Sequence, residues 1–222
     1  MSRRREVGAV LFDLDGTLLD TAPDMAAALN RLLAEEGIAP LPFSTIRPHV
    51  SQGSPRLLEL CFGRPEPAQF ELLRQRFLDH YQRGLADQTR VFDGYDEVLA
   101  ALELAGLRWG IVTNKPGWLT EPLLAALGLL ERSGCTVSGD TLAERKPHPL
   151  PLQHAARALG LPAARCVYVG DAERDVQAAR SAGMMAVVAG FGYLGTDTDP
   201  ASWQADAILA RPTDLLAWLG LQ

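Results

Sequence analysis

Short apolar runs recur along this chain, and several of them end in polar residues. The first run covers residues 7–12 and is followed at once by Asp13-Leu14-Asp15-Gly16-Thr17. An apolar run of this length is typical of a strand in the centre of a parallel sheet, where both faces are covered. We predict further strands at residues 106–113, 135–138, 166–170, 185–189 and 207–209.

Helical patterns alternate with these runs. Apolar residues recur at helical spacing in residues 22–36, and Gly37 is placed to end that helix. We predict further helices at residues 119–127, 150–159, 174–182 and 215–219. Such alternation is typical of a doubly wound, Rossmann-like parallel sheet, so the predicted fold class is α/β.

The segment from residue 40 to residue 84 has a different character. It contains six prolines and only short helical patterns, at residues 57–62 and 70–81, and no pattern typical of a strand. We therefore predict an all-helical insertion between the first and second strands of the sheet. We place this insertion at residues 22–89 and the α/β core at residues 1–21 and 90–222.

Composition and charge limit the classes of partner. The chain has 222 residues and is 47% hydrophobic, which is enough for a sizeable core. Its net charge of −6 argues against a nucleic-acid surface. An anionic substrate would therefore need local positive charge or a metal ion.

Nothing in the sequence predicts a membrane segment or a disulfide framework. The basic start at residues 1–5 is followed by only a short apolar run, which suits neither a signal peptide nor a membrane span. The three cysteines, Cys61, Cys135 and Cys166, are odd in number and far apart. This pattern fits structural thiols in a reducing compartment, so we expect a cytoplasmic protein.

The carboxylates of Asp13 and Asp15 follow the first predicted strand directly. In open α/β sheets, ligands collect at the carboxyl ends of the strands, so these side chains lie where chemistry is expected. Two neighbouring carboxylates repel each other unless a cation lies between them or one is protonated. The alternative is a solvated acidic turn, because Asp and Gly favour turns for local reasons.

Two later loops carry groups suited to a phosphate. Thr113 and Asn114 follow a predicted strand and could offer a hydroxyl and backbone N–H donors to a phosphoryl oxygen, although such a pair can also simply close a strand. Lys115 and Lys146 are the only lysines among 21 basic residues, and each precedes a proline. This usage indicates positions where a compact ammonium is needed. We assign Lys146 to the site and rank Lys115 as the weaker candidate.

Asp171 and Asp175 follow another predicted strand. Their carboxylates would join those of Asp13 and Asp15 at one edge of the sheet, and such a set of oxygen ligands favours Mg²⁺. The alternative is that both aspartates stabilise the N-terminus of the helix that follows.

In this order, these motifs resemble those of the haloacid dehalogenase superfamily, and residues 13–24 are most similar to its phosphoglycolate phosphatase branch. The resemblance covers nearly the whole chain and implies that the helical insertion is a cap domain. It implies that Asp13 is a nucleophile and Asp15 a general acid and base. It also implies that the Asp13 carboxylate, the Asp15 carbonyl and Asp171 hold Mg²⁺, while Asp175 orients a coordinated water or Lys146.

The resemblance further implies hydrolysis of a small phosphorylated metabolite through an aspartyl phosphate. Phosphoglycolate is the first choice of substrate. N-acetylmuramic acid 6-phosphate is the second, because residues 109–116 and 192–206 are similar to those of the muramic acid phosphatases. A β-phosphoglucomutase-like phosphosugar mutase and a non-catalytic binding protein on the same fold stay open. We expect a monomer or a homodimer.

The resemblance places a substrate-facing loop at residues 46–56. Arg47 in this loop could bind a substrate carboxylate through two parallel hydrogen bonds. An equally good interpretation is a solvated arginine at a helix end.

Overall fold

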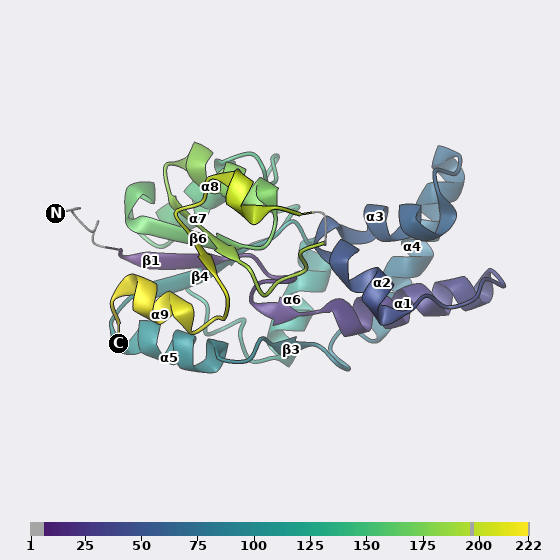
Figure 1. Ribbon diagram of the computed structural model, residues 1–222, viewed down its shortest axis with the longest axis horizontal. Helices are drawn as coiled ribbons and strands as arrows, with labels where there is room; N and C mark the ends of the chain where they lie inside the picture. The colour runs from purple at the N-terminus through teal and green to yellow at the C-terminus, as the bar shows by residue number, and fades with distance from the viewer. Residues whose placement is uncertain (1–6, 196–197, 222) are drawn as a thin grey trace.

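The computed structural model describes residues 7–195 and 198–221. A six-stranded sheet with the strand order β5-β4-β1-β6-β7-β8 forms its centre (Figure 1). Every pair of neighbouring strands in this sheet is parallel. The strands are β1 (Ala9–Phe12), β4 (Arg108–Val112), β5 (Thr136–Val137), β6 (Cys166–Gly170), β7 (Met185–Ala189) and β8 (Ala207–Leu209).

Strand β1 is the central strand, and all four of its residues are completely buried. Its last residue, Phe12, lies opposite Ile111 of β4 and Val169 of β6. The three strands therefore end side by side, and the loops that follow them meet at one edge of the sheet. The chain continues to β4 on one side of β1 and reaches β6 on the other, which makes this edge a switch point of the topology.

Helices cover both faces of the sheet. On one face lie α5 (Tyr95–Leu104), α6 (Gly117–Ala126) and α9 (Asp214–Leu219), and on the other lie α7 (Leu150–Ala158) and α8 (Glu173–Ala182) (Figure 1). The side chains of β1 alternate between the two hydrophobic layers: Val10 and Phe12 face the first, and Ala9 and Leu11 face the second. This double coverage explains why the strand reads as a continuous apolar run.

A helical insert separates two short strands, β2 (Leu19–Asp20) and β3 (Arg90–Val91), which pair antiparallel. The insert consists of α1 (Ala22–Glu35), α2 (Phe43–Ile46), η1 (Arg47–Gln52), α3 (Gly53–Phe62) and α4 (Pro67–Arg83). It extends from the carboxyl edge of the sheet, beyond the end of β1 (Figure 1). Two further short helices, η2 (Ala163–Arg165) and η3 (Pro200–Trp203), belong to the α/β part of the chain and not to the insert.

The predicted fold class is confirmed, including the helical insert and the parallel sheet. Helix α5 was not predicted, although its buried residues Tyr95, Val98, Leu99 and Leu102 follow helical spacing. The two-residue strands β2 and β3 are too short to produce a periodic pattern. The domain boundaries at residues 22 and 89 stay a prediction. None of the described helices is both long and apolar enough to cross a membrane.

The buried carboxylate of Asp24 joins the beginning of the insert to its end. It is 3% exposed and accepts hydrogen bonds from the backbone N–H groups of Gln88 and Thr89 and from Thr89 Oγ1, the shortest at 2.7 Å. We expect Asp24→Ala to lower the free energy of unfolding by about 3 kcal/mol, because it leaves buried donors without an acceptor. Urea denaturation followed by circular dichroism measures this loss. The exposed Asp87, substituted by alanine, is the matched control, and an equal loss there would contradict the interpretation.

Candidate active site

The loops after β1, β4 and β6 bring Asp13, Thr113 and Asp171 to one edge of the sheet, and all three are at most 3% exposed. The loop after β1 turns at Gly16, whose φ is +79°. A Cβ atom there would lie 2.1 Å from Asp171 Oδ2. Glycine at this position therefore allows both the left-handed turn and the close approach to Asp171.

Lys146 provides the positive charge at the centre of this edge. Its side chain is fully buried, and Nζ lies 2.8 Å from Asp13 Oδ1 and 2.9 Å from Asp175 Oδ1. Nζ also donates to the hydroxyl of Tyr168 at 2.6 Å, and that hydroxyl donates to the carbonyl of Val112 at 2.7 Å. A buried ammonium needs such partners, since an unpaired charge in this position would be very costly.

The side chain of Asn114 holds the backbone of Lys146. Its Nδ2 donates to the Lys146 carbonyl at 2.9 Å, and its Oδ1 accepts from the Lys146 N–H at 3.0 Å. Thr113 Oγ1 accepts from the backbone N–H of Lys115 at 3.1 Å. That the backbone N–H of Asn114 binds a phosphoryl oxygen stays a prediction, while its side chain holds the backbone of Lys146.

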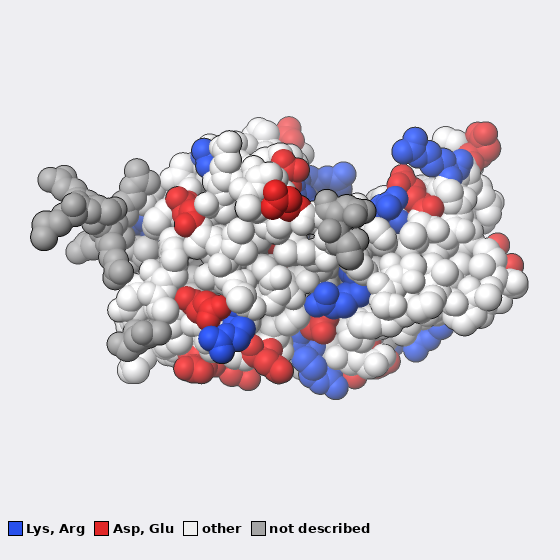
Figure 2. Space-filling view, viewed as in Figure 1, with Lys and Arg blue, Asp and Glu red and all other residues white. Residues whose placement is uncertain are grey.

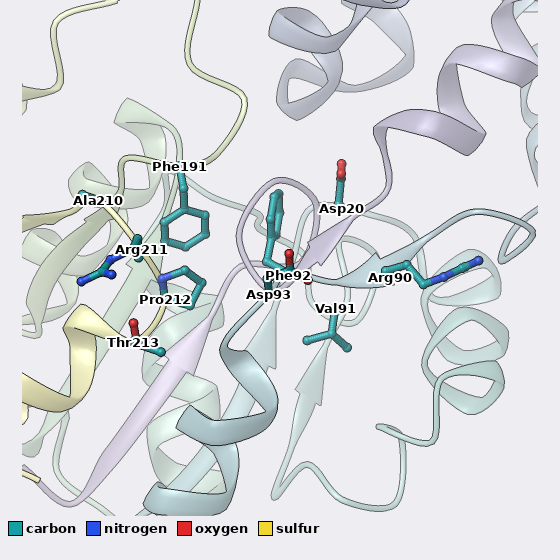
Figure 3. Close-up of a pocket in the computed structure, with 10 residues that line it drawn as sticks. All are labelled: Asp20, Arg90, Val91, Phe92, Asp93, Phe191, Ala210, Arg211, Pro212 and Thr213. Atoms are coloured by element: carbon teal, nitrogen blue, oxygen red, sulfur yellow. The ribbon is translucent and has the colours of Figure 1, made fainter. Parts of the chain in front are cut away.

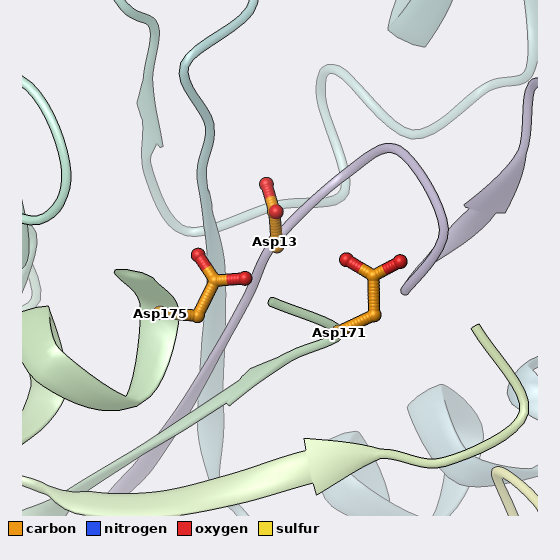
Figure 4. A group of neighbouring side chains, drawn as sticks. All are labelled: Asp13, Asp171 and Asp175. Carbon is orange, nitrogen blue, oxygen red and sulfur yellow. The ribbon is translucent and has the colours of Figure 1, made fainter. Parts of the chain in front are cut away.

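Three carboxylates, those of Asp13, Asp171 and Asp175, could together hold a cation. One oxygen from each lies within 4.8 Å of the others (Figure 4). Asp171 Oδ2 accepts from Ser51 Oγ at 2.5 Å and from the N–H of Tyr193 at 2.9 Å. Asp171 Oδ1 is buried and has no hydrogen-bond partner among the described residues. Such an orphaned carboxylate oxygen fits a hard cation with oxygen ligands, such as Mg²⁺.

Both oxygens of Asp175 already have partners within the protein. Oδ1 faces Lys146, and Oδ2 accepts from the N–H of Ala172 at 3.0 Å, at the start of α8. This geometry places Asp175 where it orients the lysine and stabilises the helix end at the same time. The two interpretations offered by the sequence therefore coexist.

Burial changes the ionisation of the cluster in the protein without a metal ion. Burial raises the pKa of the Asp13 carboxyl to about 6, against the opposing effect of the Lys146 ammonium. Burial, together with the charges of Asp13 and Asp175, raises the pKa of Asp171 to about 7. Burial therefore disfavours the ionised forms of these carboxylates, and a bound cation would stabilise them.

Asp15 lies beside the cluster and is held by its own lysine. Its Oδ1 accepts from Lys115 Nζ at 2.8 Å and from Thr21 Oγ1 at 2.7 Å. Lys115, which the sequence ranked as the weaker candidate, thus contacts one of the two predicted catalytic aspartates. Burial alone would lower the pKa of the Lys115 ammonium, but Asp15 and Tyr81 raise it above its ordinary value.

A cavity of about 600 Å³ lies between the sheet edge and the insert. The core contributes Asp13, Asp15, Thr113, Asn114, Lys115 and Lys146 to its wall. The insert contributes the end of η1, the start of α3 and the residues Arg74, Leu78 and Tyr81 of α4. Among the charged lining residues, five cations face three carboxylates, so the cavity is locally positive although the chain is acidic overall.

Comparison with known proteins identifies this arrangement. Residues 7–183 match the family of haloacid dehalogenase-like hydrolases. The chain belongs to this family. It is 51% identical to the phosphoglycolate phosphatase of Xanthomonas campestris pv. campestris, over 93% of this chain and 94% of that protein. It is 41% identical to the N-acetylmuramic acid 6-phosphate phosphatase of Pseudomonas aeruginosa, over 96% and 95% of the two chains.

A solved structure shares the whole architecture of this hydrolase. The crystal structure of a predicted phosphoglycolate phosphatase from Haemophilus somnus superposes with a TM-score of 0.85 and 27% sequence identity. The match covers 97% of this chain and 99% of that one. The helical insert and the core therefore recur together in that protein.

Arg47 of the hydrolase lies at the boundary between insert and core and is not among the residues that line the cavity. Its guanidinium donates to the carbonyls of Gly192 and Phe191 and lies 4.9 Å from the centre of the Tyr193 ring. A substrate carboxylate could reach Arg47 only if these contacts opened. Arg47 is thus half-buried and held by backbone carbonyls rather than solvated, and its binding of a substrate carboxylate stays a prediction.

Three residues of the site were not predicted from the sequence. Ser51 binds Asp171, Tyr81 binds Lys115, and Arg174 donates to the carbonyl of Ser51 at 2.5 Å. Burial would lower the pKa of Arg174, but Asp175 and Asp13 raise it, so its charge adds to that of Lys146. Ser51 and Tyr81 belong to the insert, and no local pattern shows how the insert contacts the core.

A second hollow of about 480 Å³ lies beside β2 and β3 (Figure 3). Phe92 and Phe191 form part of its wall, while the side chains of Arg90 and Arg211 point away from its centre (Figure 3). None of the predicted site residues lines it.

Acidic and basic side chains are interspersed on the face shown in Figure 2, without a continuous basic area.

We predict that Mg²⁺ stabilises the hydrolase, and more at high than at low pH. The raised pKa values mean that, without metal, the folded protein binds more protons than the unfolded chain, so it loses stability as pH rises from about 4 to about 7. A cation that binds the ionised carboxylates should recover this loss. Thermal melts at a pH of about 5 and about 8, with MgCl₂ or with EDTA, measure the effect.

Asp171→Asn should remove most of the Mg²⁺-dependent rise in Tm, because it removes a carboxylate of the cluster. Asp214, a half-buried aspartate of α9 that pairs with Arg211, is the matched control when substituted by asparagine and should keep the full rise. A rise that is independent of pH, or one that survives in Asp171→Asn, would contradict the assignment of the cluster as a cation site.

Proposed function

We propose that this protein is a Mg²⁺-dependent phosphomonoesterase that works through an aspartyl phosphate on Asp13, and that 2-phosphoglycolate is its substrate. The observation that carries this proposal is the convergence of Asp13, Lys146 and Asp171 on one buried edge of the sheet, with the orphaned oxygen of Asp171 beside the lysine ion pair. The phosphatases among its relatives support the same reaction class.

The reaction begins with attack of the Asp13 carboxylate on phosphorus, in line with the departing oxygen. The bond between phosphorus and the ester oxygen breaks, and Asp15 gives its proton to that oxygen. Asp15 then takes a proton from a water molecule, which attacks the phosphorus of the aspartyl phosphate. Inorganic phosphate leaves, and Asp13 and Asp15 return to their initial states.

The chain stabilises the transferring phosphoryl group mainly by fixed charge and fixed donors. The Lys146 ammonium, the Thr113 hydroxyl and the backbone N–H groups of the loops supply positive charge and hydrogen bonds. Bound Mg²⁺ would neutralise charge on the phosphoryl oxygens, held by the carboxylates of Asp13 and Asp171 and the carbonyl of Asp15. Asn114 and Tyr168 keep the lysine in place, since each binds it directly.

The positive lining of the cavity favours a leaving group that carries a carboxylate. Lys115 and Lys146 are already paired with aspartates, whereas Arg145 lines the cavity with an exposed side chain and Arg74 is paired only with Glu71 of its own helix. These two arginines, together with Arg174, whose buried Nε has no hydrogen-bond partner among the described residues, are therefore the cations that could bind a substrate carboxylate. Phosphoglycolate carries such a group.

N-acetylmuramic acid 6-phosphate is the alternative substrate, and the size of the cavity favours it. A cavity of about 600 Å³ has room for a sugar phosphate, whereas phosphoglycolate would fill only a small part of it. That compound also carries a carboxylate, so the positive lining fits both. A phosphosugar mutase remains a third alternative.

We place the reaction in the cytoplasm, because Cys61, Cys135 and Cys166 are all free thiols. A monomer or a homodimer would suit this site, since the described residues of one chain line the whole cavity.

Asp13→Asn should abolish turnover at any Mg²⁺ concentration, because the amide cannot act as the nucleophile. We expect a fall in kcat of at least about a thousandfold, measured as phosphate release from 2-phosphoglycolate and from p-nitrophenyl phosphate. Asp140→Asn, which alters another aspartate of the cavity wall, is the control for a change of charge. Residual hydrolysis close to that of the wild type would rule out Asp13 as the nucleophile.

A panel of substrates decides between the candidate leaving groups. We expect kcat/KM for 2-phosphoglycolate to exceed that for N-acetylmuramic acid 6-phosphate and for hexose phosphates by about tenfold or more, and all activity to need Mg²⁺. If N-acetylmuramic acid 6-phosphate has the higher kcat/KM, the alternative replaces the first choice. Absence of hydrolysis across the panel would overturn the proposed function itself.

A further inference from the structure

Lys115 connects the insert to the core through a single buried ammonium. Its Nζ donates to Asp15 Oδ1 at 2.8 Å and to the hydroxyl of Tyr81 at 2.9 Å. Asp15 follows β1 in the core, whereas Tyr81 lies near the end of α4 in the insert. Tyr81 is 1% exposed and Lys115 is 8% exposed, so the contact between these two residues is shielded from solvent.

The two lysines of the chain form parallel arrangements. Each of them binds one of the two catalytic aspartates and one tyrosine hydroxyl, and each lies near the face of that tyrosine, at 5.2 Å for Lys146 and 4.5 Å for Lys115. The difference is where the tyrosine comes from. Tyr168 belongs to β6 of the core, and Tyr81 belongs to the insert.

We propose that Tyr81 is a positioning residue that acts through Lys115, so that Asp15 is correctly oriented only when the insert contacts the core. This inference rests on the proposed function, in which Asp15 is the general acid. Asp13 has no such dependence on Tyr81, because its lysine is held by Tyr168 within the core.

The geometry at Asp15 shows how orientation would be set. Its Oδ1 accepts both from Lys115 and from Thr21, which directly precedes α1 of the insert. None of the hydrogen bonds of the described residues reaches Oδ2, which leaves that oxygen for the proton that moves to the leaving group. Loss of one contact on Oδ1 would let the carboxyl group rotate.

A buried ammonium loses more than one hydrogen bond when the insert moves away. Lys115 has three N–H donors and would lose both the hydroxyl and the face of Tyr81. It would then be free to leave Asp15 for other acceptors or for water. The position of α4 and the orientation of Asp15 are therefore coupled through one side chain.

The test compares substrates that differ in their need for an acid. Tyr81→Phe removes one hydroxyl and keeps the ring, which stacks on Phe77 and lies near Lys115. We expect kcat/KM for 2-phosphoglycolate to fall about tenfold, which corresponds to one hydrogen bond lost in the transition state. Hydrolysis of p-nitrophenyl phosphate, whose leaving group departs without a proton, should change by less than about twofold.

Tyr95→Phe is the matched control, because Tyr95 is equally buried and its hydroxyl has no partner among the described residues. Tyr95→Phe should leave kcat/KM unchanged for both substrates. As a second variant, Lys115→Met should lower kcat/KM more for 2-phosphoglycolate than for p-nitrophenyl phosphate. Thermal melts verify that each variant is folded.

Each outcome separates this inference from the proposed function. A selective loss on 2-phosphoglycolate in Tyr81→Phe supports the positioning role. An equal loss on both substrates, or no loss on either, overturns it while the wild-type activity still supports the proposed function. A wild-type protein that hydrolyses no phosphomonoester overturns the proposed function, and the inference with it.

Discussion

The structure depends on the balance of charge around one buried ammonium. Asp13, Asp171 and Asp175 are each at most 3% exposed, and Lys146 is the cation that pairs with two of them. Burying this many carboxylates is costly unless each is paired or binds a cation. The register of β1 against its neighbours brings the acids together, and Tyr168 holds the lysine at their centre. Much of the sheet edge is thus constrained by electrostatics rather than by packing.

A division of tasks follows from where each supporting residue lies. Asp13, the proposed nucleophile, is held by Lys146 and Tyr168 of the core, so it is organised before a substrate arrives. Asp15 depends on Lys115, which also contacts the insert through Tyr81. Under the proposed coupling, Asp15 is oriented to protonate a leaving group only when the insert contacts the core. The same contact excludes bulk water from the site. The two aspartates, separated by one residue in the sequence, therefore depend on different parts of the molecule for their orientation.

The sequence predicted what depends on strand ends and missed what depends on the docking of the insert. Asp13, Lys146 and Asp171 could be predicted to converge because parallel strands end at one edge and each motif follows a strand. The contacts of Ser51 and Tyr81 could not be predicted, because they depend on long-range packing of helices without a local signal. Lys115 was ranked below Lys146, although the scarcity of lysine among 21 basic residues marked both alike, and its contact with Asp15 has no local signal in the sequence.

The acidic cluster also gives a physical reason for the proposed use of a metal ion. Lys146 pairs with two of the three neighbouring carboxylates, and burial, together with the charges of the other carboxylates, raises the pKa of Asp13 and of Asp171. A phosphate ester is itself an anion and would be repelled by ionised Asp13, the group that must attack it. A divalent cation at Asp171 reverses the sign of the field at this point. The arginines at the cavity wall attract the ester, but only a charge inside the cluster lets the two anions react.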